Sequence, residues 1–453
     1  MATQTLAVWA TNLEFDSLPA SVVEAAVRSF HNWAGCAIGG STHPATQIAR
    51  KTLAAFAGSP TSTILGSVEK TDAQTAALIN GISSHVYDYD DTHLATVIHP
   101  AGPVASALLA ATQHDIAKVG SVDGKAFIVA LVAGIEAACK VGLAVYPDHY
   151  DVGWHITGTA GSIGAAVAVA KILNLDVQAM QWAIGIAATQ VTGLREQFGS
   201  MTKSFHPGRA AQNGLLAAML ASNGYDSSLA SLEAKRGWAN VVSASNRLET
   251  VLQGLGSTWE TEQNTFKPFP CGIVIHPAID GAIQIHNETQ DQHQNIDAAR
   301  IQSVHLTVHP LVLELTGKRN PKTGLEAKFS VYHGAAVGLL FGRAGLAQFT
   351  DDVATHPTVV HLRDKVDATS DASLRPDEAR VRVDFGEGVA SEKHVQHAVG
   401  SLEAPMTNEQ LDAKFVEQCA PVLGEDIAKK SSDHCWLLRD VDDVGAFAFM
   451  ALS

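Results

Sequence analysis

The chain has 453 residues, 46% of them hydrophobic, which is long enough for two domains with a core each. Asp and Glu outnumber Lys and Arg by 46 to 31, and the net charge of −15 argues against a nucleic-acid or anionic-membrane partner but not against a small anionic substrate. Five scattered cysteines indicate reduced thiols, and the N-terminus shows no signal-peptide pattern, so we expect a cytoplasmic protein.

The first portion of the chain has the pattern of closely packed helices. Residues 17–40 have helical spacing and end in glycines. The very apolar run 126–146 is interrupted by two charged residues, so it predicts a buried core helix and no membrane span. In 158–175, Ala160 and Gly164 are four residues apart, and small residues at this spacing let a neighbouring helix approach closely.

The pattern changes after about residue 266. Residues 301–310 and 378–388 alternate between apolar and polar side chains, which predicts strands with one buried face. We therefore predict a mainly α protein with a smaller α+β domain inserted into a large all-helical domain. The helical domain would comprise residues 1–266 plus 400–453, and the α+β domain residues 267–399.

Ionisable residues concentrate in five short segments beside glycine, proline or turn residues. Taken singly, each segment has an ordinary structural explanation as a helix end or a surface loop. Their joint occurrence at predicted helix ends and loops, where catalytic groups tend to lie, favours a functional site. The segments are residues 85–100, 149–161, 195–211, 267–281 and 327–336.

The segment 85–100 permits several kinds of chemistry. His85, Asp88, Asp90, Asp91 and His93 offer nitrogen and oxygen ligands for zinc or magnesium, but they lack a defined ligand spacing, so we predict no metal. Asp88 to Asp91 also fit the DxDD pattern of protonation-initiated terpene cyclases. Aromatic residues make up only 6% of the chain, however, and the other segments supply cations, which do not suit a carbocation.

The remaining alternative is proton transfer beside a carboxylate of a small di- or polycarboxylate. Lys203, Arg209 or Lys267 would bind the substrate carboxylates and the developing negative charge. Histidines with a pKa near neutrality would carry the proton. Asp88 is the predicted orienting partner of His99, whereas Asp90, Asp91 and His93 are expected to be loop and helix-start residues.

Several of these segments carry motifs that resemble the MmgE/PrpD family. The motifs, in family order, are YDYDDTH (87–93), GWHITGTAG (153–161), TKSFHPGRAA (202–211), KPFPCGIVIHPAID (267–280) and AKFS (327–330). The resemblance implies an inserted α+β lid domain, a homodimer, a pocket between the domains, and reactions on di- or tricarboxylates without a cofactor.

The resemblance also implies site residues, carried over position by position. These are Asp88, Thr92, His99, His155, Lys203, His276 and Tyr332. We add Tyr146 as a candidate proton-transfer residue, and Arg209 and Lys267 as candidate carboxylate ligands.

Within this family, the length and overall pattern of the chain favour a cofactor-independent epimerase of iminodisuccinate. Such an enzyme needs a base on one face of the reacting carbon and an acid on the other, and we expect two of Lys203, His99, His155 and Tyr146 to fill these roles. The alternatives are a lyase on a tricarboxylate, similar to 2-methylcitrate dehydratase or cis-aconitate decarboxylase, and a helical binding protein without activity.

Overall fold

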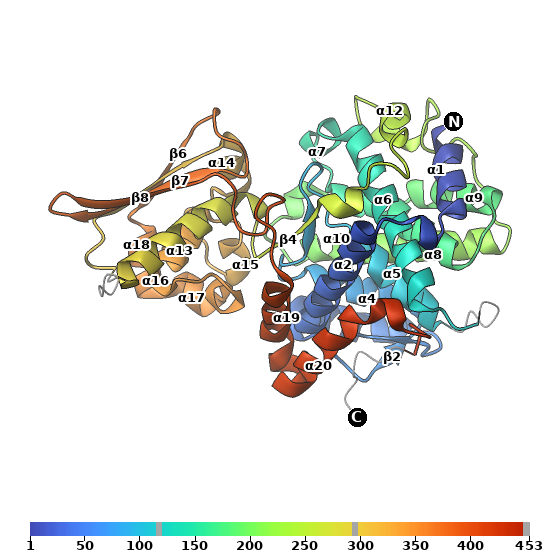
Figure 1. The fold of residues 1–453 in the computed structure, drawn as a ribbon, viewed down its shortest axis with the longest axis horizontal. Helices are drawn as coiled ribbons and strands as arrows, with labels where there is room; N and C mark the ends of the chain where they lie inside the picture. Colours follow the sequence, from blue (N-terminus) through green and yellow to red (C-terminus); the bar gives the residue numbers. More distant parts are fainter. Residues whose placement is uncertain (115–119, 292–297, 447–453) are drawn as a thin grey trace. The chain divides into compact units, whose positions relative to one another are not determined.

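The computed structural model divides into two compact units (Figure 1). The structure describes residues 1–114, 120–291 and 298–446. The first unit comprises Met1–Val86, Asp90–Thr265 and Asn408–Ser453, and the second comprises Tyr87–Tyr89 and Phe266–Thr407. The first is built almost wholly of helices and the second of helices and a sheet, so the predicted mainly α fold with a smaller α+β part is confirmed.

The first unit packs its helices around one large apolar core. Its helices are α1 (Ala2–Asn12), α2 (Ala20–Gly39), α3 (Pro44–Leu53), α4 (Ala73–His85), α5 (Ala101–Gln113), α6 (Gly124–Val145), α7 (Asp148–Asp151), α8 (Ile156–Ile172), α9 (Val177–Ala188), α10 (Thr202–Ser222), α11 (Trp238–Val242), α12 (Leu248–Leu252), α19 (Asn408–Leu423) and α20 (Glu425–Trp436). Two short strand pairs join β1 (Ser62–Thr63) to β2 (Lys70–Thr71) and β3 (Asp91–His93) to β4 (Asn264–Phe266).

Small residues bring the central helices of the first unit into close contact. A Cβ atom on Gly164 of α8 would lie 2.6 Å from the carbonyl oxygen of Gly134 on α6, so only glycine fits at this crossing. A Cβ atom on Gly81 of α4 would lie 2.5 Å from the Cα of Gly208 on α10. Helix α6 is long and apolar enough to cross a membrane, but 94% of its most apolar stretch is buried, as in a core helix.

The C-terminal helices pack against α2 of the first unit. Lys414 of α19 donates a 2.7 Å hydrogen bond to the side-chain oxygen of Asn32. A Cβ atom on Gly35 would lie 2.7 Å from the Phe415 ring. At this contact α2 therefore contributes backbone and α19 contributes an aromatic ring. The chain therefore returns to the first unit after building the second.

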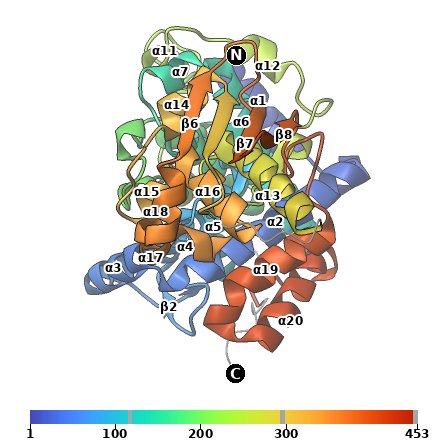
Figure 2. The same cartoon turned by 90° about the vertical axis from the view of Figure 1, so that its left-hand side faces the viewer.

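The second unit is a four-stranded sheet with α13 and α16 packed against it (Figure 2). The strand order is β6-β5-β7-β8, with β5 parallel to β6 and the other neighbours antiparallel. The elements are α13 (His276–Asp291), β5 (Ser303–Val308), α14 (Pro310–Thr316), α15 (Gly324–Ala327), α16 (Val331–Phe341), α17 (Asp351–Thr355), α18 (Pro357–Arg363), β6 (Val366–Ser370), β7 (Ala379–Gly386) and β8 (Val389–Val395).

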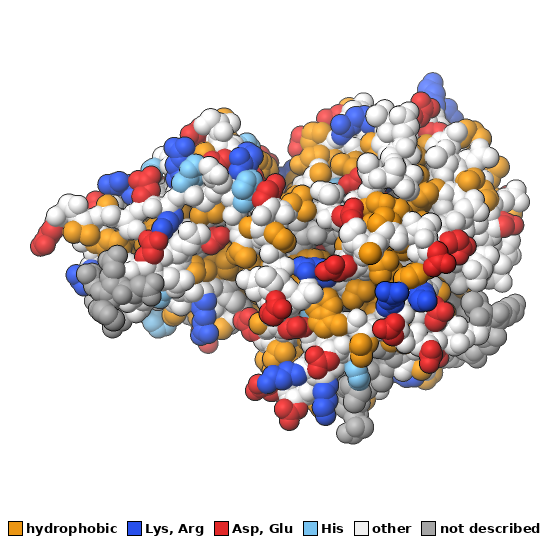
Figure 3. Space-filling view, viewed as in Figure 1, with side chains coloured by type: hydrophobic (Ala, Val, Ile, Leu, Met, Phe, Trp, Pro, Cys, Tyr) orange, Lys and Arg blue, Asp and Glu red, His pale blue; other side chains and the backbone are white. Residues whose placement is uncertain are grey.

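The alternation that predicted the strands is confirmed in β5 and β7. Val304 and Leu306 of β5, and Val381 and Val383 of β7, are buried on the helix-covered face. At the surface of the molecule, acidic and basic side chains are interspersed on the face seen in Figure 3, where the surplus of acidic residues does not gather into one patch.

Candidate active site

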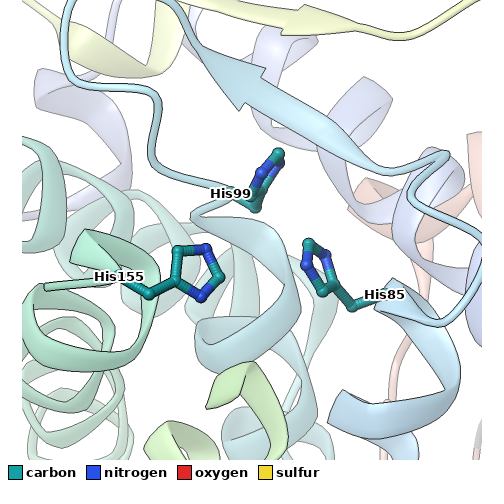
Figure 4. A group of neighbouring side chains, drawn as sticks. All are labelled: His85, His99 and His155. Atoms are coloured by element: carbon teal, nitrogen blue, oxygen red, sulfur yellow. The ribbon is translucent and has the colours of Figure 1, made fainter. Parts of the chain in front are cut away.

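Three buried histidines from separate segments of the first unit form the centre of the site (Figure 4). His85 is the last residue of α4, His99 lies just before α5, and His155 precedes the first residue of α8. The ring centroids of His85 and His99 are 4.8 Å apart. The ring centroid of His155 lies 6.0 Å from that of His85 and 6.3 Å from that of His99. The side chains are therefore neighbours inside a protein core, where imidazoles need specific partners.

A pair of acidic residues anchors two of these rings. The Nδ1 atom of His85 lies 2.6 Å from a carboxylate oxygen of Asp90, and because a carboxylate only accepts, Nδ1 donates. The other Asp90 oxygen lies 3.6 Å from Nδ1 of His99. Nδ1 of His99 also donates to the backbone carbonyl of Asp91 at 2.6 Å and is 3.2 Å from the Thr92 hydroxyl. These bonds fix the tautomers of both rings.

The third ring, His155, pairs with His206 of α10. Their Nδ1 atoms are 2.8 Å apart, so one ring donates and the other accepts. Burial lowers the pKa of His155 well below its usual range, and positive charge on His206 and on Lys203 lowers this pKa further. Burial, then the charges of His85 and Lys203, lower the pKa of His206 to about 4. Both rings are therefore neutral near pH 7.

Lys203 supplies a cation beside this neutral pair. It lies on α10 three residues before His206, so the two side chains share one face of the helix. Lys203 is buried, and its Nζ atom is 5.2 Å from the centre of the Phe198 ring, whose edge meets His155 at 5.1 Å between centroids. The site thus combines hydrogen-bonding imidazoles with a buried positive charge suited to an anionic substrate.

Of the predicted site residues, Thr92, His99, His155 and Lys203 come together in the first unit. Tyr146 follows the last residue of α6; its ring centroid lies 6.0 Å from that of Tyr150, and its carbonyl accepts from Arg247. Arg209 lies on α10 and bonds to Gln212. Among the described residues, no contact joins Tyr146 or Arg209 to the three central histidines.

The other predicted residues belong to the second unit. Asp88 and Lys267 form a buried ion pair of 2.6 Å, and the lysine also donates to the Asp88 carbonyl. His276 begins α13 and meets Phe269 edge to face. The Tyr332 ring is 4.5 Å from the guanidinium of Arg319.

Two expectations from the sequence need correction. The carboxylate 3.6 Å from His99 belongs to Asp90, whereas the carboxylate of Asp88, its expected orienting partner, accepts from Lys267. Asp90, Asp91 and His93 were expected to be loop and helix-start residues, but Asp91 and His93 lie in β3 and all three are buried. Asp91 accepts from the Ala101 amide and from Asn264, and burial and the neighbouring charge of Asp90 raise its pKa to about 7.

The sequence interpretation did not select His85, Asp90 or His206 as site residues. For His206 a signal was present, because a histidine three residues after Lys203 shares its helical face. For His85 and Asp90 the signal was weaker. The four other acidic and histidine residues of this segment, Asp88, Asp91, His93 and His99, were equally suitable site residues by their spacing. Ligand atoms of His85, His99 and His155 lie within 4.8 Å of one another, and so do those of His85, Asp90 and His99, so either set of three could hold a metal ion.

Two models of one protein family match most of the chain. The model of the MmgE/PrpD N-terminal domain matches residues 4–251, and that of the MmgE/PrpD C-terminal domain matches residues 269–438. The chain belongs to the MmgE/PrpD family.

Curated relatives extend over nearly the whole chain. A cis-aconitate decarboxylase of Aspergillus terreus is 28% identical over 94% of this chain and 90% of its own length. A cis-aconitate decarboxylase-like protein of Aspergillus oryzae is 27% identical, covering 98% of this chain and 95% of its own. The human cis-aconitate decarboxylase is 24% identical, covering 97% and 92%.

Proposed function

We propose that the chain is a lyase that removes carbon dioxide from an unsaturated tricarboxylate of the cis-aconitate kind, without a redox cofactor. The observation that carries the proposal is the buried group of neutral imidazoles beside Lys203, in a chain whose relatives are named as decarboxylases. A buried cation next to neutral hydrogen-bonding groups suits an anion that loses one of its carboxylates.

The reaction balances with groups that the first unit supplies. Cleavage of the bond between carbon and a carboxylate releases carbon dioxide and leaves an electron pair, which the adjacent double bond and the carboxylate at its far end delocalise. The far end of this allylic system then takes up one proton. His155 and His206 are neutral near pH 7. We therefore assign Lys203 as the proton donor, because a lysine ammonium group offers N–H donors and no acceptor. Solvent then reprotonates the amine.

His155 would orient a substrate carboxylate in this scheme. When its Nδ1 atom accepts the hydrogen bond shared with His206, its Nε2 atom carries an N–H that donates to the carboxylate. Orientation of this kind accelerates a reaction because the entropy of alignment is lost on binding and not in the transition state.

Epimerisation of iminodisuccinate, the activity that the sequence favoured, is the rival. It uses the same groups, since an epimerase also needs a proton donor and an acceptor beside a carboxylate. The curated relatives reported above are named for decarboxylation, which favours the lyase.

One experiment in deuterated water separates these activities. With cis-aconitate we expect release of carbon dioxide and one deuterium in the organic product. Deuterium entering iminodisuccinate without gas release would support the epimerase instead. Folded protein that releases no carbon dioxide from any unsaturated tricarboxylate contradicts the proposal.

Two substitutions test the role of Lys203. Lys203→Met removes charge and proton, whereas Lys203→Arg keeps the charge on a group that does not deprotonate in proteins. We expect both variants to lose about 100-fold or more in kcat, the usual scale for a general acid. Lys203→Arg should retain more substrate affinity than Lys203→Met. Equal kcat in Lys203→Arg and the unchanged protein would contradict the donor role.

A further inference from the structure

The three central histidines are held in a similar way. Each has its Nδ1 atom engaged: by the Asp90 carboxylate in His85, by the Asp91 carbonyl in His99, and by His206 in His155. Metal-binding histidines in proteins are held in the same way, with one ring nitrogen bonded to a carboxylate or carbonyl and the other bound to the ion.

The remaining nitrogen of His85 points to a missing partner. Its Nε2 atom is buried and has no hydrogen-bond partner among the described residues, and the whole residue is only 1% exposed. An unpaired nitrogen in a protein interior has a free-energy cost, so a ligand that fills it is favoured. One nitrogen from each of the three histidines lies within 4.8 Å of the others. Tetrahedral zinc, with bonds of about 2.0–2.1 Å, needs nitrogens roughly 3.4 Å apart, so shifts below about 1 Å per ring would close the site.

Charge around the cluster both favours and opposes a dication. The carboxylate of Asp90 lies directly behind His85 and 3.6 Å from Nδ1 of His99, which is where a metal site gains from negative charge. Lys203 acts in the other direction, because its positive charge already lowers the pKa of His155. The site should therefore bind a dication reversibly, and removal of the lysine charge should tighten binding.

We propose that His85, His99 and His155 form a binding site for Zn²⁺, with the three imidazoles as protein ligands and a water molecule or substrate oxygen completing the coordination. Under the function proposed above, a bound ion occupies the nitrogen of His155 that orients substrate, so Zn²⁺ acts as a reversible inhibitor. The binding itself does not depend on that function.

The described residues offer a matched control in the second unit. Asp377, His397 and Glu403 also place three ligand atoms within 4.8 Å, but there the histidine and Asp377 are half-buried and Glu403 is exposed. His397→Gln therefore removes the competing cluster and leaves the three-histidine site intact.

Calorimetric titration of the metal-stripped protein with Zn²⁺ tests the proposal. We expect one ion per chain in the unchanged protein and in His397→Gln, and loss of at least about 10-fold in affinity in Asp90→Asn, which keeps all three ligands but weakens their anchoring. His85→Gln should abolish the binding. No binding in the unchanged protein, or binding lost in His397→Gln and kept in His85→Gln, overturns the proposal.

Two further measurements keep the test independent of folding and of activity. X-ray absorption at the zinc edge of the unchanged protein should show three imidazole ligands, and a spectrum with fewer than three overturns the site even if the variants do not fold. Lys203→Met should lose decarboxylation yet bind Zn²⁺ more tightly. If Lys203→Met stays active, the proposed function fails while the metal site stands; if it binds Zn²⁺ more weakly, the metal site fails.

Discussion

His155 and His206 share one hydrogen bond between identical atoms, so their protonation states are linked. Two N–H groups cannot face each other across 2.8 Å, which means that the pair in this geometry holds at most one proton between the two Nδ1 atoms. The loop behind the pair enforces the contact. Gly193 has a φ of +102°, and a Cβ atom there would lie 3.1 Å from the His206 ring and 3.3 Å from the Cβ of His155.

Replacement of His206 should move the pH dependence of activity. Burial contributes most to the lowered pKa of His155, followed by positive charge on His206, Lys203, His85 and His99. In His206→Asn no positive charge can form at this position as pH falls, so the lowered pKa of His155 rises. Because His155 must be neutral to orient substrate, the acid limb of the kcat/KM profile should shift to higher pH.

The measurement is a kcat/KM profile against pH for both proteins, with melting temperature as a control for folding. An acid limb that stays in place, or that moves to lower pH, contradicts the assigned electrostatic link between the two rings.

The helix crossing between α4 and α10 positions the residues of the site. Gly81 and Gly208 touch backbone to backbone, and this contact sets the distance between His85 at the end of α4 and Lys203 and His206 in the first turns of α10. Helix α10 begins at Thr202, so Pro207 lies inside it and Lys203 is a buried residue of its first turn.

Gly208→Ala tests this crossing. A Cβ atom there would lie 2.4 Å from the Leu78 carbonyl oxygen, so α4 and α10 must move apart. We expect a loss of about 1–3 kcal/mol in the free energy of unfolding, as for other overpacked sites, together with reduced kcat. Urea denaturation measures the first quantity, with exposed Ser222→Ala on the same helix as the control. An unchanged free energy in Gly208→Ala would show that the crossing is loosely packed.

A second buried polar network joins α6 to the segment before β4. Glu136 accepts from the amide and hydroxyl of Thr261, while Lys140 donates to Glu260 at 2.6 Å. Burial raises the pKa of Glu136 to about 7. At Glu260, burial alone would raise the pKa, but hydrogen bonds from His93 and Lys140 outweigh it and lower the pKa to about 2.

Glu136→Gln should flatten the dependence of stability on pH. Since the pKa of Glu136 is raised from 4.5 to about 7 on folding, the folded state binds more protons between these values. Its contribution to stability is complete below pH 4.5 and is lost as pH rises through 7. The glutamine variant should therefore lose less stability between pH 4.5 and 7 than the unchanged protein, measured by urea denaturation at several pH values. An equal or steeper decline would contradict the raised pKa.

At the scale of the whole molecule, the first unit depends on helices from both ends of the chain. Phe415 of α19 covers Gly35 of α2, and Lys414 bonds to Asn32 in the same helix. The C-terminal helices α19 and α20 are therefore part of the core of the first unit.

Phe415→Ala should destabilise the first unit as a whole. Loss of a buried aromatic ring costs about 3–5 kcal/mol, and we expect one cooperative unfolding transition at lower urea concentration. Leu437→Ala, at a side chain that is 53% exposed, is the control. If far-UV circular dichroism instead shows early loss of a small helical fraction, the C-terminal helices fold independently of α2.

The fold was largely predictable because each element carries its own periodicity. The buried run of α6 and the alternation of β5 and β7 depend on local patterns, so neighbouring residues sufficed to predict them. The residues of the site were harder to predict from the sequence. Asp88 and Asp90 are equivalent by local spacing, yet Asp90 bonds to His85 and Asp88 to Lys267, a residue 179 positions away. Which acid meets which base depends on long-range packing that a pattern of spacing does not contain.

The segment Tyr87–Tyr89 has a mechanical consequence. It belongs to the second unit, fixed there by the Asp88–Lys267 pair and by Lys328, which donates to the Tyr87 carbonyl at 2.6 Å. The residues on either side, up to Val86 and from Asp90, belong to the first unit. The peptide links on both sides are covalent, so the segment acts as a short tether between His85 and Asp90. The hydrogen bond between His85 and Asp90 therefore closes a loop of the chain whose middle residues pack in the second unit.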